Sequence, residues 1–319
     1  MAGRVGVLSE LAGAAVRPAD DALWIVNPTA GFGRGRRQEE RLRRELPDAR
    51  VHRTTRAGEA AEVAARAVRD GCRTIVVVGG DGTLTEVAGA VLADDGPEDV
   101  AVGFAPAGTC NDFSRGRAAS RDMAGLLDRD RGVRIDVGHV TFATDGGTGS
   151  RHFVVNSTVG FVSRLGERFT RKTSANLALK RVGLEVSQAV LGADTLARWR
   201  PLRLTLTVDG ERIESEATNL AVMKVPYFAG GLSFGDFGTL DDGRLHAVLL
   251  GGLSRPRVAN AMWRAFRRRL DGHPALRHWA AGTVTVESDP PWPVEVDGEI
   301  VGRTPATYTV LPRRLTTIT

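Results

Sequence analysis

A glycine-rich segment in the first third of the chain combines the residue types that bind phosphate. Thr74–Glu86 (TIVVVGGDGTLTE) is a β-branched run, typical of a buried strand, followed by a glycine-rich turn and the start of a helix. Glycines let a phosphate approach backbone N–H groups, and a helix N-terminus adds a favourable dipole. Asp81 would repel phosphate directly, so its presence indicates a Mg²⁺ ion or a substrate hydroxyl between them. The alternative is a tight strand-to-helix turn with Asp81 as its cap.

Two other strand-to-loop junctions carry the same residue types. Val26–Gly31 (VNPTAG) follows the first candidate strand, and Phe104–Phe113 (FAPAGTCNDF) follows the fourth. Thr54 and Thr55, at the end of the second candidate strand, fit a nucleotide contact and an N-cap of the next helix equally well. Together the three turns predict a phosphate-binding edge outside the carboxyl ends of parallel strands.

These turns lie in a first half that alternates short β-branched runs with segments rich in Ala, Leu, Glu and Arg. Such an alternation is typical of βαβ units around a parallel sheet. The expected strands are residues 22–26, 49–53, 74–78, 100–104 and 133–137, and the expected helices are residues 36–46, 58–70 and 84–93.

The pattern changes after about Gly138. Short runs of β-branched and apolar residues, several of which alternate with polar ones, predict antiparallel strands at residues 153–155, 202–208, 218–225, 245–250, 283–287 and 294–296. Turn dipeptides such as Asp209-Gly210 and Asp242-Gly243 separate several of these runs. Helical patches are expected at residues 175–191 and 257–270. The sequence therefore predicts an α/β domain followed by an all-β domain, with a β-sandwich favoured over a barrel.

The composition excludes several classes of protein. The chain has 319 residues, 42% of them hydrophobic, which is ample for a buried core in about two domains. The chain contains no run of 18 apolar residues, the length needed to span a bilayer. Glu10 also interrupts the apolar core that a signal peptide would need, so we expect a cytoplasmic protein. Cys72 and Cys110 lack metal-ligand spacing, which indicates small core residues in a reducing compartment.

The net charge of +5 comes from one segment. Residues 255–270 contain six arginines and no acids, so that the rest of the chain sums to −1. Five apolar residues recur there at helical spacing: Val258, Met262, Trp263, Phe266 and Leu270. This pattern predicts either a basic amphipathic helix on an anionic membrane surface or an ordinary helix whose apolar face packs on the sheet. No recognisable nucleic-acid-binding module accompanies the charge.

Five motifs, in their order along the chain, resemble those of the lipid kinases that carry a diacylglycerol kinase catalytic domain. This family includes bacterial diacylglycerol kinase-like proteins and sphingosine kinases. The motifs are Asn27–Gly31, Gly79–Thr83, Pro106–Phe113, Leu240–Gly243 and Val296–Glu299. The second motif is shared with NAD kinases and phosphofructokinases, whereas the full set is specific to the family.

The resemblance implies the arrangement of the domains. Residues 20–137 would form a nucleotide-binding α/β domain of the NAD kinase and diacylglycerol kinase type, completed by residues 306–319. Residues 138–305 would form a β-sandwich domain for the lipid substrate, with ATP in the cleft between the two domains.

The resemblance also implies which residues contact ATP. They fall on the three turns and on the threonine before the second helix: Asn27, Pro28, Thr29, Ala30, Gly31, Thr54, Gly79, Gly80, Asp81, Gly82, Thr83, Leu84, Thr85 and Thr109. Thr54 is chosen over Thr55 because it keeps the family's spacing to Glu59-Ala60. Thr85 departs from the family, which usually has an asparagine before the glutamate.

A Mg²⁺ site and a general base are implied in the same way. The metal would be held by Thr239, Asp242 and Arg244, the arginine through its backbone carbonyl. A second, water-mediated Mg²⁺ network of some members would fall on Asp81, Asp112 and Asp136. The segment before Asp241 lacks the family's usual Pro-Asp-Ala, which leaves the conformation of the metal loop less certain than its aspartate.

The resemblance places the general base in the turn that contains Asp297 and Glu299. The two carboxylates are two residues apart, so they would face the same side of an extended segment. The alternative is a plain hairpin turn, because Asp-Gly is its commonest signal. We expect Glu299 to be the base, assisted by Asp297 and with Asp81 also catalytic, since a carboxylate can accept the proton of a lipid hydroxyl as the new bond forms.

These expectations together predict an ATP- and Mg²⁺-dependent lipid kinase that phosphorylates diacylglycerol or a similar membrane alcohol in phospholipid biosynthesis. It would be cytoplasmic or peripheral at the inner face of the membrane. Its partners would be the lipid and an anionic membrane surface, without nucleic acid, and a homodimer is left open. The alternatives are an NAD kinase, which shares Gly79–Thr83 but not the later motifs, and a non-catalytic nucleotide- or lipid-binding regulator.

Overall fold

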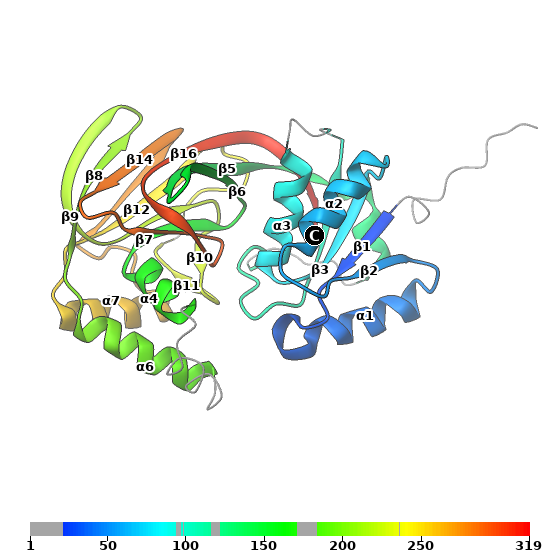
Figure 1. Cartoon of the computed structure of the whole chain (residues 1–319), viewed down its shortest axis with the longest axis horizontal. Helices are drawn as coiled ribbons and strands as arrows, with labels where there is room; N and C mark the ends of the chain where they lie inside the picture. The colour runs from blue at the N-terminus through cyan, green and yellow to red at the C-terminus, as the bar shows by residue number, and fades with distance from the viewer. Residues whose placement is uncertain (1–21, 94–96, 98, 116–121, 171–183, 236) are drawn as a thin grey trace, which may run out of the picture.

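The computed structural model describes residues 22–93, 97, 99–115, 122–170, 184–235 and 237–319. Figure 1 shows an α/β domain on one side of the molecule and a β-rich domain on the other, with a long strand running across both. This arrangement confirms the predicted fold class of a parallel-sheet domain followed by an antiparallel β domain.

Four parallel strands from the first half of the chain form most of the sheet of the α/β domain. Their order across the sheet is β2 (Arg50–Arg53), β1 (Ala22–Val26), β3 (Thr74–Gly79) and β4 (Ala101–Pro106). Because the strands are parallel, the turns that follow β1, β3 and β4 all leave the sheet at the same edge.

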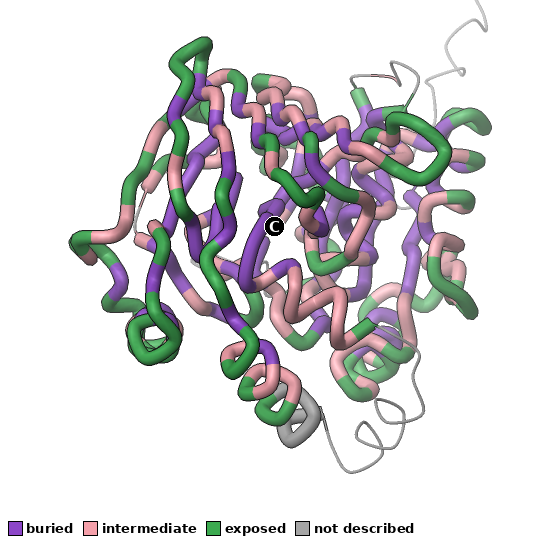
Figure 2. Tube along the Cα trace, turned by 60° about the vertical axis from the view of Figure 1, so that its left-hand side comes forward, coloured by how far each residue is buried: buried purple, intermediate pink, exposed green. Residues whose placement is uncertain are grey.

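Three helices cover the two faces of this sheet: α1 (Arg34–Glu45), α2 (Glu59–Arg69) and α3 (Asp81–Leu92). Alternate residues of the strands point to opposite faces. Ile25 and Val77 pack with α2 and α3, whereas Trp24 and Val76 pack on the other face with Leu42 of α1. Figure 2 shows the buried strands of the molecule between more exposed helices and turns.

The second half of the chain is mainly antiparallel. Its longer strands are β5 (Val133–Thr144), β6 (Gly147–Phe153), β7 (Asn156–Gly160), β8 (Leu202–Val208), β9 (Glu211–Met223), β12 (Leu245–Gly251), β13 (Leu276–Ala281), β14 (Thr283–Ser288), β15 (Pro293–Val296) and β16 (Glu299–Ile318). Two short strands, β10 (Tyr227–Phe228) and β11 (Leu232–Ser233), form a separate pair. The helices of this half are α4 (Phe161–Thr170), α6 (Leu184–Ala197) and α7 (Arg255–Phe266). In the first half of the chain, short 3-10 helices lie at Ala30–Gly33, Ala124–Leu127 and Arg129–Arg131.

Two long strands, β9 and β16, each pair with strands on both of their sides. Hydrogen-bonded pairs run from β9 through β8, β14, β16, β15 and β7 back to β9, so these strands form a closed circuit. The end of β16 then leaves the β domain, and Thr316–Ile318 pair in parallel with β4. One strand therefore connects the β15–β16 hairpin to the parallel sheet.

Two of the expected strands differ from the structure. The expectation of a parallel strand at residues 133–137 is wrong, because β5 pairs antiparallel with β16, whose last residues occupy the place beside β4. The expectation of a strand at residues 153–155 is also wrong, since β6 ends at Phe153 and β7 begins at Asn156. Of the expected helix at 175–191, residues 175–183 lie outside the described residues and the rest belongs to α6.

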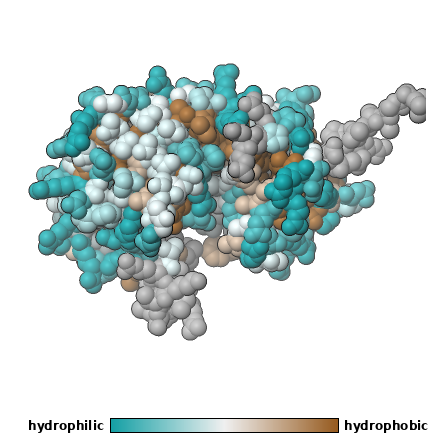
Figure 3. Space-filling view, turned by 45° about the horizontal axis from the view of Figure 1, so that its top comes forward, coloured by the Kyte–Doolittle hydropathy of each residue, from teal (hydrophilic) through white to brown (hydrophobic). Residues whose placement is uncertain are grey.

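Within the described residues, no helix is long and apolar enough to cross a membrane. On the face that Figure 3 displays, hydrophilic side chains surround smaller groups of apolar ones.

Candidate active site

The turns after β1, β3 and β4 meet in a cleft of about 660 Å³, which we call the outer cleft. Eight of the residues expected to contact ATP line it: Asn27, Pro28, Thr29, Ala30, Thr54, Gly80, Gly82 and Thr83. The Nδ2 of Asn27 donates to Oγ1 of Thr83 at 3.2 Å, which ties the first turn to the second. The backbone N–H of Ala107 donates to the carbonyl of Gly79 at 2.6 Å, which ties the third turn to the same place.

Glycine is required where these turns touch. Gly31 has a φ of +55°, and a Cβ atom there would lie 2.1 Å from the carbonyl oxygen of Ala107. A Cβ atom on Gly108 would lie 2.4 Å from Cα of Gly80. The three turns therefore pack backbone against backbone, an approach that only glycine permits at these positions.

The other six expected contacts do not line the outer cleft. Gly31 and Gly79 lie in the packed turns, whereas Leu84 and Thr85 are buried. Asp81 and Thr109 line a second cavity. The alternative of an N-cap is wrong for Thr54 and Thr55, because Gly58 precedes α2 and no side chain caps it. It is also wrong for Asp81, which is the first residue of α3 and follows the N-cap position, Gly80.

The second cavity, which we call the inner cavity, has a volume of about 320 Å³ and lies between the two domains. It is lined by Gly80, Asp81, Gly82, Thr109, Cys110, Asp112, Val155, Asn156, Val162, Phe228, Ala229, Glu295, Asp297 and Gly298. Gly80 and Gly82 line both spaces, so the glycine turn after β3 is a shared wall. The described lining combines four carboxyl groups with apolar side chains and contains no lysine or arginine.

Asp297 joins the two domains through its carboxylate. Oδ2 accepts from the hydroxyl of Thr85 at 2.5 Å and from the N–H of Val154 at 3.2 Å, and Oδ1 accepts from the N–H groups of Val155 and Asn156 at 3.1 and 2.8 Å. These N–H groups face Asp297 where the chain passes from β6 to β7, which explains the missing strand at 153–155. Burial raises the pKa of Asp297 to about 6, although the hydrogen bonds from Thr85, Asn156 and Val154 oppose this rise.

Asp297 and Glu299 do not face the same side, so that expectation is wrong. Asp297 and Gly298 have φ angles of +45° and +90° and form the hairpin turn between β15 and β16. The turn directs Asp297 into the inner cavity, whereas Glu299 lines the outer cleft. The Glu299 carboxylate is exposed at its edge and accepts from Nη1 of Arg151 at 2.7 Å.

Asp81 also binds backbone N–H groups across the site. Its two oxygens accept from the N–H groups of Asp112 and Phe113 at 3.0 and 3.1 Å, which fixes the third turn to the start of α3. Asp112 in turn accepts from the N–H of Gly230 at 3.0 Å. Burial raises the pKa of both carboxyl groups, and the backbone hydrogen bonds oppose that rise.

Glu295 is a site residue that the sequence analysis missed. It lines the inner cavity, and its Oε2 accepts from the hydroxyl of Thr158 at 3.1 Å. Burial raises its pKa to about 7. A glutamate between two valines has the pattern of a strand residue that faces solvent, so only the packing of α4 and the β15–β16 hairpin reveals its position.

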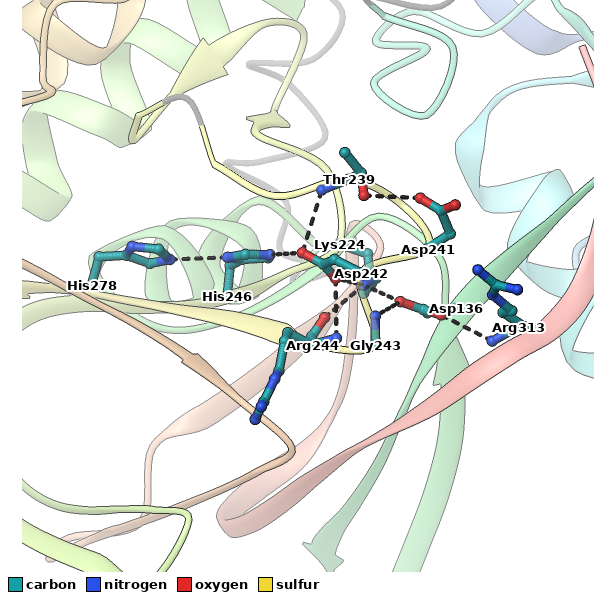
Figure 4. A network of polar contacts seen from close by, with 10 residues as sticks. All are labelled: Asp136, Lys224, Thr239, Asp241, Asp242, Gly243, Arg244, His246, His278 and Arg313. Atoms are coloured by element: carbon teal, nitrogen blue, oxygen red, sulfur yellow. Dashed lines mark hydrogen bonds and ion pairs between the residues drawn. The ribbon is translucent and has the colours of Figure 1, made fainter.

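The three expected metal ligands lie together but outside both spaces. In Figure 4, Asp242 accepts from Thr239 N–H at 3.3 Å, from Arg244 N–H at 3.0 Å and from Nζ of Lys224 at 3.1 Å. Partial burial opposes ionisation of Asp242, but the hydrogen bond from His246 and the charge of Lys224 lower its pKa. Asp136 binds Lys224 at 2.9 Å and is not among the residues that line the inner cavity with Asp81 and Asp112. The described residues contain no group of three or more His, Cys, Asp or Glu side chains arranged to hold a metal ion.

Comparisons with known proteins agree with this architecture. Residues 21–140 match the model of the diacylglycerol kinase catalytic domain, and residues 170–319 match that of the YegS C-terminal NAD kinase beta sandwich-like domain. Diacylglycerol kinases of Staphylococcus aureus strains MRSA252 and bovine RF122 / ET3-1 are each 27% identical over 305 residues, which cover 92% of this chain and 90% of theirs.

Solved structures share the fold. A diacylglycerol kinase from Bacillus anthracis str. Sterne has a TM-score of 0.66 at 21% identity, over 93% of this chain and 96% of that one. Yeast NADH kinase complexed with NADH has a TM-score of 0.51 at 11% identity, over 93% of this chain and 82% of that one.

We predict that Glu295 makes stability depend on pH. Its folded-state pKa lies above the ordinary value, so the stability it contributes is complete below about pH 4.5 and is lost as the pH rises to about 7. The test is the free energy of unfolding by denaturant for wild type and for Glu295→Gln, which cannot ionise. From pH 4.5 to pH 8, the free energy of unfolding of the variant should rise by about 2 kcal/mol relative to that of wild type. A difference between the two proteins that does not change with pH would contradict the assignment.

Proposed function

Since the chain belongs to the diacylglycerol kinase catalytic-domain family of kinases, we propose that it transfers a phosphoryl group from ATP to the hydroxyl of diacylglycerol or a similar membrane alcohol. The observation that carries this proposal is the pair of adjoining spaces that share Gly80 and Gly82 as a wall. A donor bound in one space and an acceptor bound in the other would meet at this glycine turn.

The outer cleft suits the polyphosphate of ATP. Its walls include turn backbone, hydroxyl groups and the first turn of α3, which are the groups that bind phosphate at the edge of a parallel sheet. Arg56 adds a positive charge to this lining, and Glu86 and Glu299 add two carboxylates. The dipole of a helix contributes about 0.3–1 kcal/mol, so the turns would position the phosphates rather than supply all of the affinity.

The inner cavity suits an uncharged acceptor. Asp81, Asp112, Glu295 and Asp297 would repel the phosphates of a dinucleotide, and the described lining offers no cation to offset them. Val162 and Phe228 provide an apolar wall beside these carboxyl groups. This contrast favours a lipid alcohol over NAD, although the fold is shared with a NADH kinase.

We assign the role of general base to Glu299 and a positioning role to Asp297. The Asp297 carboxylate already accepts four hydrogen bonds, whereas Glu299 has one described partner, Arg151, and reaches the outer cleft. In the proposed step the acceptor oxygen attacks the terminal phosphorus of ATP, and the bond from that phosphorus to the bridging oxygen breaks. The hydroxyl proton passes to Glu299, and ADP leaves.

Substitution of Glu299 tests this step. Glu299→Gln should lower phosphate transfer from labelled ATP to diacylglycerol in mixed micelles by about 10²–10⁴-fold, because the amide cannot accept the proton. ATP affinity, measured by calorimetry, should change little. Asp297→Asn should lower both transfer and thermal stability, since one carbonyl oxygen cannot accept all four hydrogen bonds.

Glu287→Gln is the matched control, because Glu287 is an exposed glutamate that lines neither space. It should keep the wild-type rate. If Glu299→Gln transfers phosphate at the wild-type rate, Glu299 is not the general base. If the wild-type protein transfers phosphate to no lipid alcohol, the proposed activity is rejected.

We further propose that α7 docks the protein on an anionic membrane. Val258, Ala261 and Ala265 are buried in the core of the β domain, which agrees with the alternative of an ordinary packed helix. Trp263 and Phe266, however, are 55% and 72% exposed among the arginines of this segment. Exposed aromatic side chains beside cationic ones fit the interface of a bilayer with anionic headgroups.

Vesicle binding tests the docking surface. The double variant Trp263→Ser/Phe266→Ser should partition onto phosphatidylglycerol-containing vesicles at least about tenfold more weakly than wild type. Its activity on a short-chain, water-soluble diacylglycerol should be unchanged. Val133→Ser replaces another exposed apolar residue and should bind like wild type. Equal binding by the double variant and wild type would refute docking through α7.

A further inference from the structure

A lysine ammonium lies where the resemblance to the lipid kinases implies a Mg²⁺ ion. Asp242 and the backbone carbonyl of Arg244 are two of the three expected metal ligands, and both accept from Nζ of Lys224, at 3.1 and 2.6 Å. Figure 4 shows Lys224, which directly follows β9, beside Asp242, Arg244 and Asp136. The third, Thr239, donates its N–H to the other oxygen of Asp242 at 3.3 Å and its hydroxyl to Asp241 at 2.9 Å.

The third contact of the ammonium completes its coordination. Nζ donates to Oδ2 of Asp136 at 2.9 Å, so its three N–H groups have three acceptors. The side chains of Lys224 and Asp136 are both fully buried. A Mg²⁺ ion requires near-octahedral oxygen ligands at about 2.0–2.1 Å, and a neighbouring ammonium would repel it. The residues of this loop therefore do not fit a bound Mg²⁺ ion.

The same carboxylate fixes the surrounding backbone. Asp136 also accepts from the N–H groups of Gly243 at 2.7 Å and Arg313 at 2.9 Å, and its own N–H donates to the carbonyl of Leu240 at 2.6 Å. These contacts join β5, the loop and β16. The loop is thus held in place by groups of the chain itself.

The choice of lysine is informative in this chain. Only three of its 43 basic residues are lysines, and Lys224 is the one that the structure describes. An ammonium is a compact point charge with three donors, whereas the planar guanidinium of arginine presents its donors in a rigid fork. The contacts from Asp136, Asp242 and Arg244 converge on one atom, which an ammonium nitrogen allows and a guanidinium does not.

We infer that Lys224 is a built-in cation that replaces a structural Mg²⁺ ion, so that the loop keeps its conformation without any divalent metal. The inference concerns this loop alone and does not depend on the proposed kinase activity.

Thermal unfolding without ATP tests the inference in the wild-type protein. Its melting temperature should differ by less than about 1 °C between EDTA and about 10 mM MgCl₂, and the purified protein should contain no stoichiometric magnesium. A marked loss of stability in EDTA, or magnesium that copurifies at one ion per chain, would overturn the inference. This measurement needs no variant and decides the question even where the variants below fail to fold.

Two substitutions test the position of the charge. Lys224→Ala leaves space beside two carboxylates and should lower the melting temperature in EDTA by about 10 °C, of which MgCl₂ or CaCl₂ should restore about 4 °C. Lys224→Met removes the charge but fills the space, so it should be destabilised without metal-dependent recovery. A folded Lys224→Ala that gains no more from metal than Lys224→Met would contradict the inference.

Discussion

The Asp297 carboxylate is the interaction on which the geometry of the site depends most. It accepts one hydrogen bond from a hydroxyl on α3 of the α/β domain and three from N–H groups at the β6–β7 junction of the β domain. Because a carboxylate away from water is costly unless its oxygens are hydrogen-bonded, these donors and Asp297 hold each other in place. The same contacts place Glu295 beside the inner cavity and Glu299 at the outer cleft, so one turn supplies both spaces.

A second buried carboxylate extends this connection away from the site. Asp136 binds Lys224, and its hydrogen bonds join β5, β16 and the loop around Asp242. Since β16 begins at Glu299 and ends beside β4, the strand links the hairpin turn to the sheet that carries the glycine turns. Buried ion pairs contribute little net stability, but removing one partner is costly, which makes such a pair a means of specifying one geometry.

The sequence predicts the parts of the site that depend on local residue order. The glycine turns follow strands in a βαβ pattern, so residue order alone predicts that Asn27, Gly80 and Thr83 lie at one edge of the sheet. The opposed directions of Asp297 and Glu299 follow from positive φ angles in a turn that the sequence also allowed to be extended. The Lys224 contact and the cavity position of Glu295 depend on segments far apart in the chain, which local patterns do not report.

We propose that a donor cleft for ATP adjoins a cavity for an uncharged lipid alcohol. The most direct test of this claim is a competition in which the wild-type protein meets labelled ATP, diacylglycerol vesicles and NAD in one reaction, followed by separation of the products. We expect the label in phosphatidic acid and none in NADP, because the carboxyl groups of the inner cavity repel an anionic acceptor. Label in NADP, or no transfer by a protein that binds ATP, would contradict the claim.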